Sequence, residues 1–170
     1  MSKTFVAVLM GSDSDLPVMQ GTLQALDSLG IAREVRITSA HRTPDVTQAY
    51  VRDAEQRGCA LFIAAAGLAA HLAGAVAAQT VRPVIGVPLD SGPLRGLDAL
   101  LSTVQMPAGV PVATLAIGAA GAKNAAYLAA QILALSDPAL AQRLRDTRRA
   151  NTEAVMGQEA ELQAQITQQP

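Results

Sequence analysis

The chain has 170 residues, a net charge of −1, 50% apolar residues and only 2% aromatic residues. This length is typical of a single domain with a sizeable core. The near-neutral charge and the scarcity of aromatic side chains exclude the electrostatic and stacking contacts that nucleic-acid binding needs, so we expect a small-molecule partner and no nucleic acid. Cys59 is the only cysteine, which excludes an intrachain disulfide and a cysteine-rich zinc site.

No segment has the pattern of a targeting or membrane-spanning sequence. The first apolar run, Phe5–Met10, is too short for a signal peptide. The long apolar stretch 60–78 is mostly alanine, contains Gly67 and Gly74 and has no aromatic belt, which is typical of a buried strand followed by a helix. We therefore expect a cytoplasmic protein that has no membrane partner.

The apolar pattern predicts five strands, each followed by a helix. Continuous apolar runs predict buried strands at residues 5–10, 33–38, 59–65, 83–87 and 112–117. Helical periodicity, with prolines in first turns and glycines just past helix ends, predicts the helices. They lie at residues 16–29, from Pro44 to Gly58, from near His71, at 97–104, at 121–135 and from Pro138 onward.

The helix that begins at Pro44 follows the segment SAHRTP. Thr43 is the expected N-cap of this helix. Val46, Ala49 and Ala54, together with Tyr50, recur at helical spacing. We expect these four side chains to form the buried stripe that packs on the sheet.

Repeated alternation of strand and helix predicts right-handed βαβ units and an α/β fold. We expect a three-layer αβα sandwich with a five-stranded parallel, flavodoxin-like sheet of order 2-1-3-4-5. Residues 1–157 are expected to form one domain, in which about 137–157 form an extended C-terminal helix for oligomerisation. Residues 158–170 are expected to be a flexible tail.

The loops that carry polar or glycine-rich motifs all follow predicted strands. They read GSDSD, SAHRTP, AAGLAAH, PLDSGPL and IGAAGAKN. In open parallel sheets, ligands bind beyond the carboxyl ends of the strands. We therefore expect these loops to gather at one edge of the sheet and to form the site.

GSDSD places Ser12 and Asp15 where a helix begins. Free backbone N–H groups and the helix dipole favour an anion there. Ser12 can hydrogen-bond a phosphate, and Asp15 can accept from ribose hydroxyls or a ring amine. Alternatively, both residues only cap the helix. The loop alone does not decide between these interpretations.

SAHRTP contains three side chains that suit a reaction on an anionic metabolite. His41 can move a proton near neutral pH, Arg42 can hold a phosphate or carboxylate, and Ser39 can position the ligand. His71 either faces the same site or is a satisfied core histidine. Two histidines with scattered aspartates do not make a metal site, so no metal is expected.

Taken in order, these loops resemble the 5-(carboxyamino)imidazole ribonucleotide mutase family of purine biosynthesis, in its class I form. The resemblance spans residues 6–135 and rests on GSDSD, SAHRTP, AAHLAG, PVIGVPLDSGPLRGLDALLSTVQMP and IGAAGAKNAA. It implies isomerisation of N5-carboxyaminoimidazole ribonucleotide to 4-carboxy-5-aminoimidazole ribonucleotide without ATP, metal or organic cofactor. It also implies a homo-oligomer, typically an octamer, with a shared C-terminal helix.

The resemblance further implies roles for individual residues. Ser12, Asp15 and Arg42 bind the ribonucleotide, His41 handles the proton and His71 lines the site. The remaining expected substrate-binding residues are Ser39, Ala66, Gly67 and Leu68. The family commonly has glycine at positions 65 and 68 and proline at 73, where this chain has Ala, Leu and Ala. A left-handed backbone at Leu68 would cost about 1–2 kcal/mol.

Two alternatives stay open at this point. A carboxylase would join free CO₂ to aminoimidazole ribonucleotide, as class II relatives do, but AAHLAG and the QMP loop favour the mutase. A non-catalytic nucleotide-binding or flavin-binding module on the same fold would bind its ligand without turnover.

Overall fold

The structure is a computed structural model that describes residues 4–167. The chain divides into two compact units, Met1–Ile132 and Leu133–Pro170. Within the described residues, no helix is both long and apolar enough to cross a membrane. The last three residues of the predicted tail, 168–170, lie outside the described part of the chain.

A five-stranded parallel sheet is the middle layer of the first unit. Its strands run in the spatial order β2-β1-β3-β4-β5, and every neighbouring pair is parallel. The predicted fold class and strand order are confirmed. The strands are β1 (Phe5–Met10), β2 (Arg33–Ile37), β3 (Cys59–Ala66), β4 (Val84–Pro88) and β5 (Ala113–Thr114).

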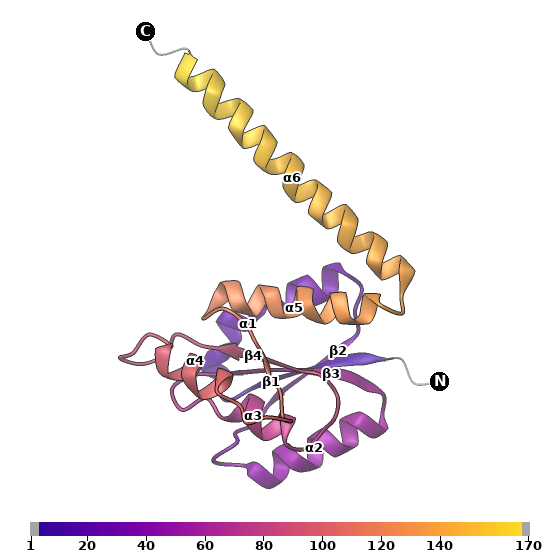
Figure 1. The fold of residues 1–170 in the computed structure, drawn as a ribbon, viewed down its shortest axis with the longest axis vertical. Helices are drawn as coiled ribbons and strands as arrows, with labels where there is room; N and C mark the ends of the chain where they lie inside the picture. The colour runs from indigo at the N-terminus through magenta and orange to yellow at the C-terminus, as the bar shows by residue number, and fades with distance from the viewer. Residues whose placement is uncertain (1–3, 168–170) are drawn as a thin grey trace. The chain divides into compact units, whose positions relative to one another are not determined.

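Helices cover both faces of this sheet (Figure 1). One face carries α1 (Leu16–Ser28) and α5 (Ala119–Ala134). The opposite face carries α2 (Pro44–Gln56), α3 (Leu72–Ala77) and α4 (Leu97–Val104). This arrangement is the expected three-layer sandwich.

Small side chains let the layers approach one another closely. At Gly86 in β4, an added Cβ would lie 2.4 Å from Thr103 Cγ2 in α4 and 3.4 Å from Ala73 Cβ in α3. The buried face of α5 is made mostly of alanine, including Ala122 and Ala126. The alanine-rich, aromatic-poor composition therefore serves close packing of helices on the sheet.

The stripe that α2 buries differs from the predicted one. Val46 is 59% exposed and Ala49 is exposed, whereas Thr47 is buried and Ala54 is buried as predicted. The Thr47 hydroxyl lies 2.6 Å from the hydroxyl of Thr38, which is also buried. Because this hydrogen bond satisfies both hydroxyls, a polar residue can occupy a core position that the apolar pattern had assigned to its neighbours.

The fifth strand is shorter than the sequence predicts. Only Ala113 and Thr114 pair with β4, opposite Ile85 and Gly86, although residues 112–117 were expected to form a strand. At the edge of the sheet, one side of the strand has no neighbour to hold it, so the apolar run continues as a loop into α5.

The second unit consists mainly of the long helix α6, Pro138–Thr167. The Asp137 carboxylate accepts a hydrogen bond of 2.9 Å from the Leu140 N–H and so caps the start of this helix. The helix continues to Thr167, beyond the expected end near 157. The added segment is rich in Gln, Glu and Ala, which favour helix. The flexibility of the tail stays a prediction.

Candidate functional site

A cavity of about 440 Å³ lies at the carboxyl end of the sheet. Loops that follow β1, β2, β3 and β4 all contribute to its lining. The structure brings every predicted site residue to this cavity: Ser12, Asp15, Ser39, His41, Arg42, Ala66, Gly67, Leu68 and His71. The edge predicted from the topology of a parallel sheet is therefore where these side chains meet.

The loop after β1 is held by two reciprocal hydrogen bonds. The Ser12 N–H donates to Asp15 Oδ2 at 3.0 Å, and the Ser14 N–H donates to Ser12 Oγ at 3.3 Å. Together they form a capping box around the 3-10 turn η1 (Asp13–Asp15) that leads into α1. Capping is therefore a real role of Ser12 and Asp15, and both residues also line the cavity.

Asp15 is 8% exposed, and this burial raises the pKa of its carboxyl. The N–H groups of Ser12 and Gly11 oppose the shift, whereas the negative charge of Asp13 adds to it. The charged form of Asp15 is thus only partly compensated within the protein. A ligand that donates a hydrogen bond would favour the carboxylate.

SAHRTP forms a tight turn between β2 and α2. The Ser39 carbonyl accepts from the Thr43 N–H at 3.0 Å, and Ser39 Oγ accepts from the Arg42 N–H at 3.1 Å. Thr43 occupies the N-cap position, but its hydroxyl accepts from the Ser39 N–H instead of capping α2. The prediction that Thr43 is the N-cap residue is confirmed, although its hydroxyl bonds within the turn and not to the first turn of α2. These bonds fix His41 and Arg42 beside the cavity.

Arg42 connects the second loop to the first. Its Nη2 donates to the Gly11 carbonyl at 3.2 Å. Among the described residues that line the cavity, Arg42 is the only arginine or lysine and Asp15 the only carboxylate. The cavity can therefore hold an anionic group at one place and a hydrogen-bond donor at another.

His41 and His71 are in direct contact across the cavity. His41 Nε2 lies 2.7 Å from His71 Nδ1, and the rings meet edge to face at 87°. A hydrogen bond between two ring nitrogens needs one proton between them, so one ring donates and the other accepts. His71 stands at the N-cap position of α3 and is exposed, which excludes the core-histidine interpretation.

The loop after β3 has the backbone strain that the sequence suggested. Leu68 has φ 54°, in the left-handed region. At Gly67, an added Cβ would lie 2.6 Å from Ser91 Oγ in the loop after β4. A close approach of two loops therefore requires glycine at 67, and the strain falls on the leucine that follows.

Sequence reasoning missed some of the lining residues. They are Gly11, Ser14, Ala40, Ala69, Leu72 and Ser91. The segment PLDSGPL was expected at this edge, but nothing in its sequence distinguished Ser91 from its neighbours. Cys59 lies away from the cavity lining and is buried, and burial raises the pKa of its thiol to about 11. It is an unreactive core thiol at neutral pH.

In the part of the chain that the structure describes, no group of three or more His, Cys, Asp or Glu side chains is arranged to hold a metal ion. The cavity instead combines a cation, hydroxyls, a carboxylate and a histidine pair. This set suits binding of a phosphorylated metabolite and proton transfer on it.

Comparison with known proteins agrees with this geometry. The N5-carboxyaminoimidazole ribonucleotide mutase of Brucella melitensis is 56% identical over 150 residues, 88% of this chain and 93% of that protein. The protein of the same name from Escherichia coli K12 is 52% identical over 151 residues, 89% of each chain. Treponema denticola PurE has a TM-score of 0.85 at 30% identity and covers 94% of this chain and 99% of its own. The family model described as "AIR carboxylase" matches residues 5–154, so the chain belongs to this family.

Proposed function

We propose that this protein is an N5-carboxyaminoimidazole ribonucleotide mutase, an isomerase of de novo purine (IMP) biosynthesis. It converts that ribonucleotide to 4-carboxy-5-aminoimidazole ribonucleotide. One observation carries the proposal: a chain more than half identical to proteins named as this mutase places a hydrogen-bonded histidine pair beside Arg42 and Asp15 in one cavity.

The cavity offers complementary groups for a ribonucleotide. Arg42 and the Ser12 hydroxyl bind the phosphate, because a guanidinium and a hydroxyl beside a helix N-terminus suit an anion. Asp15 accepts from ribose hydroxyls or from the ring amine. Ser39 donates to the ligand, while Ala66 and Gly67 form a wall without bulky side chains.

The reaction needs one proton to move between nitrogen and carbon. Protonation of the carbamate nitrogen breaks its bond to the carboxyl carbon and releases CO₂ within the cavity. The electron-rich C4 of the ring then attacks CO₂, and its proton leaves. His41 gives the first proton and takes the second, so the protein ends as it began. His71, 2.7 Å away, orients the His41 ring. No atom is oxidised or reduced overall, so the proposed reaction needs no redox cofactor.

A second candidate, suggested by the family description, is carboxylation of aminoimidazole ribonucleotide by free CO₂. The two activities share a product and differ in the source of its carboxyl group. A mutase retains the carboxyl carbon of its own substrate, whereas a carboxylase takes carbon from solution.

An ultraviolet assay with the carbamate substrate and without ATP tests the proposal directly. We expect rapid conversion, and little incorporation of labelled bicarbonate into the early product. Heavy early incorporation would identify the carboxylase instead. Binding without turnover would identify a non-catalytic module, and a yellow purified protein would indicate bound flavin.

We further infer a closed homo-oligomer, an octamer by resemblance, in which residues 137–157 contact a neighbouring copy. Residues 1–157 then form one functional domain. Val155 and Met156 in α6 support this inference, because they are exposed apolar side chains that a neighbouring copy can cover. A cytoplasmic location and the absence of a nucleic-acid partner stay predictions.

A further inference from the structure

Leu68 holds a costly backbone conformation without the burial that usually compensates it. Its φ of 54° costs an L-residue about 1–2 kcal/mol. Its side chain is 50% exposed, so the core contributes little in return. Non-glycine residues with such a backbone persist where the surroundings enforce it, and they concentrate at functional sites.

The contact that holds Leu68 comes from the loop after β4. At Gly92, an added Cβ would lie 2.4 Å from Leu68 Cδ2, so the leucine fills the space that a side chain at 92 would occupy. The neighbouring pair is nearly as close, because a Cβ at Gly67 would lie 2.6 Å from Ser91 Oγ. The two loops therefore interlock at two successive positions, and Leu68 is the largest side chain in the contact.

The contact between these two loops lies at the wall of the cavity, where it can affect the reaction. Leu68 and Ser91 both line the cavity that contains His41. Among the described lining residues, the only apolar side chains larger than alanine are Leu68 and Leu72, and Leu72 is buried in the core. Leu68 is thus the one bulky apolar group at the boundary between the cavity and solvent.

The proposed reaction requires such a boundary. Between the two chemical steps, CO₂ is bound to neither nitrogen nor carbon and carries no charge for Arg42 to hold. Loss to solvent would leave aminoimidazole ribonucleotide, the decarboxylated compound, in place of product. Exclusion of water by an apolar wall is the physical means of preventing this loss.

We propose that Leu68, latched against Gly92, retains CO₂ in the cavity between decarboxylation and recapture. This role rests on the proposed mutase function. Leu68 takes no part in bond making; it determines how the bound intermediate partitions between product and escape.

The test uses the full-length protein and substrate labelled in its carbamate carboxyl group. The measured quantity is the fraction of label released to solution relative to the fraction found in product. For Leu68→Ala and Leu68→Gly we expect this released fraction to rise about tenfold, equivalent to about 1.4 kcal/mol less barrier to escape. Aminoimidazole ribonucleotide should accumulate in the same proportion. Leu68→Met keeps an apolar side chain of similar size, so the released fraction should stay close to that of the unaltered protein.

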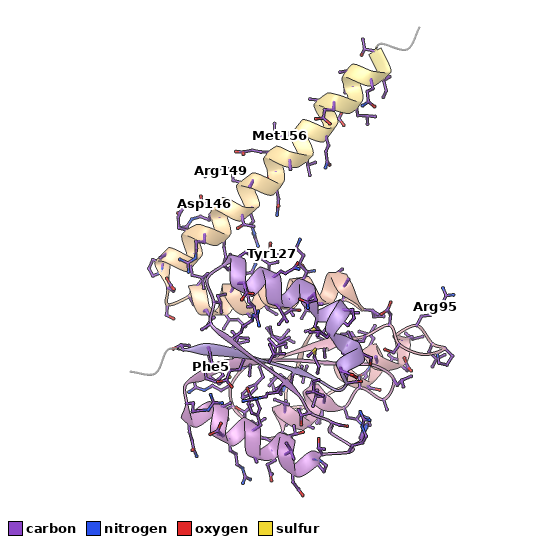
Figure 2. All side chains as sticks on the ribbon, turned by 180° about the vertical axis from the view of Figure 1, so that it is seen from behind. Phe5, Arg95, Tyr127, Asp146, Arg149 and Met156 are labelled. Carbon is purple, nitrogen blue, oxygen red and sulfur yellow. The ribbon has the colours of Figure 1, made fainter. Side chains whose placement is uncertain are left out.

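Arg95→Gly is the matched control. Arg95 also has a left-handed backbone, with φ 48°, but it does not line the cavity and its side chain projects away from the fold (Figure 2). Glycine should relieve the same kind of strain at either position, so both Leu68→Gly and Arg95→Gly should fold. Only the change at Leu68 should alter release of the label.

The outcomes separate this role from the function on which it rests. Failure of the unaltered protein to convert the carbamate would contradict the proposed mutase function. Normal conversion, with the released fraction unchanged in both Leu68→Ala and Leu68→Gly, would overturn the role of Leu68 alone. An equal rise in Arg95→Gly would also overturn it, because relief of strain would then be sufficient.

Discussion

Among single residues, His41 is distinguished by a ring nitrogen that lies within hydrogen-bond distance of a second histidine. His41→Asn removes the imidazole but keeps a side chain that can hydrogen-bond His71. We expect isomerisation to be abolished, because an amide cannot carry the proton. Ribonucleotide affinity should stay within about tenfold, since Arg42 and the helix N-termini remain. Turnover by ultraviolet assay and affinity by calorimetry check the two parts; near-normal turnover would refute the role of His41.

Asp15 links the site to stability through its raised pKa. An acid whose pKa is higher in the fold than its ordinary 3.8 binds protons more tightly when folded. The free energy of unfolding therefore falls as the pH rises from the unfolded-state pKa through the folded-state pKa, and the loss is complete above the folded-state pKa. Asn cannot ionise, yet its Oδ1 can still accept from the Ser12 N–H.

For Asp15→Asn we therefore expect a higher urea midpoint than the parent at neutral pH. The difference should shrink as the pH falls below the ordinary pKa of 3.8, where the carboxyl is protonated in both the folded and the unfolded state. Substrate affinity should fall, because a ligand donor loses a charged acceptor. Urea denaturation at several pH values, together with calorimetric titration, measures both effects. A variant less stable than the parent at neutral pH would show that the hydrogen bond to the carboxylate outweighs its desolvation.

At the scale of helices and strands, the periodicity of apolar residues and the positions of proline and glycine predicted the elements well. The limits of β1 and α4 agree with the predicted ranges, because apolar runs ended by glycine or proline have one consistent interpretation. The predicted buried stripe of α2 was right for Ala54 and wrong for Val46. Thr47 is buried instead through a hydroxyl contact with Thr38, which sequence spacing does not reveal. The fifth strand was too long because apolar character alone does not show where pairing stops.

Gly121 at the start of α5 offers a test of packing between elements. An added Cβ would lie 1.6 Å from the Ala116 carbonyl oxygen, a backbone atom that cannot move aside. We expect Gly121→Ala to lower the free energy of unfolding by about 3 kcal/mol. The matched control is Gly157→Ala in α6, where an added Cβ would meet no atom within 4 Å apart from the neighbouring backbone of its own helix. That change should stabilise the helix by about 0.5–1 kcal/mol. Chemical denaturation and circular dichroism compare them; equal effects would contradict the packing argument.

At the scale of the whole molecule, the cavity depends on connectivity more than on any one motif. Ser12, Ser39, His71 and Ser91 come from four separate loops that the parallel topology brings to one edge of the sheet. The sequence could predict this gathering, because every such loop follows a strand. It could not predict the His41–His71 contact or the place of Ser91, which depend on side-chain geometry between loops.

The long helix α6 has little within its own unit to stabilise it. Of its described residues, only Leu140 is buried. The ion pair between Arg149 and Asp146, 3.0 Å long, lies on this helix and is exposed (Figure 2). Such pairs contribute only a few tenths of a kcal/mol. Met156 and Val155 are exposed as well, so the helix carries apolar side chains that a second copy of the chain can cover.

Two truncations test whether α6 assembles the oligomer. A chain that ends at Leu135 lacks the helix, and we expect its mass by light scattering to fall well below that of the full-length oligomer. A chain that ends at Gly157 keeps the segment proposed as the contact and should retain the full-length assembly. The chain that ends at Leu135 should dissociate because contact of α6 with a neighbouring copy removes the apolar surface of this helix from water only in the assembled state. A monomeric full-length protein, or an unchanged assembly after truncation at Leu135, would contradict the role of α6. Loss of assembly in the Gly157 chain would instead place the contact in residues 158–170.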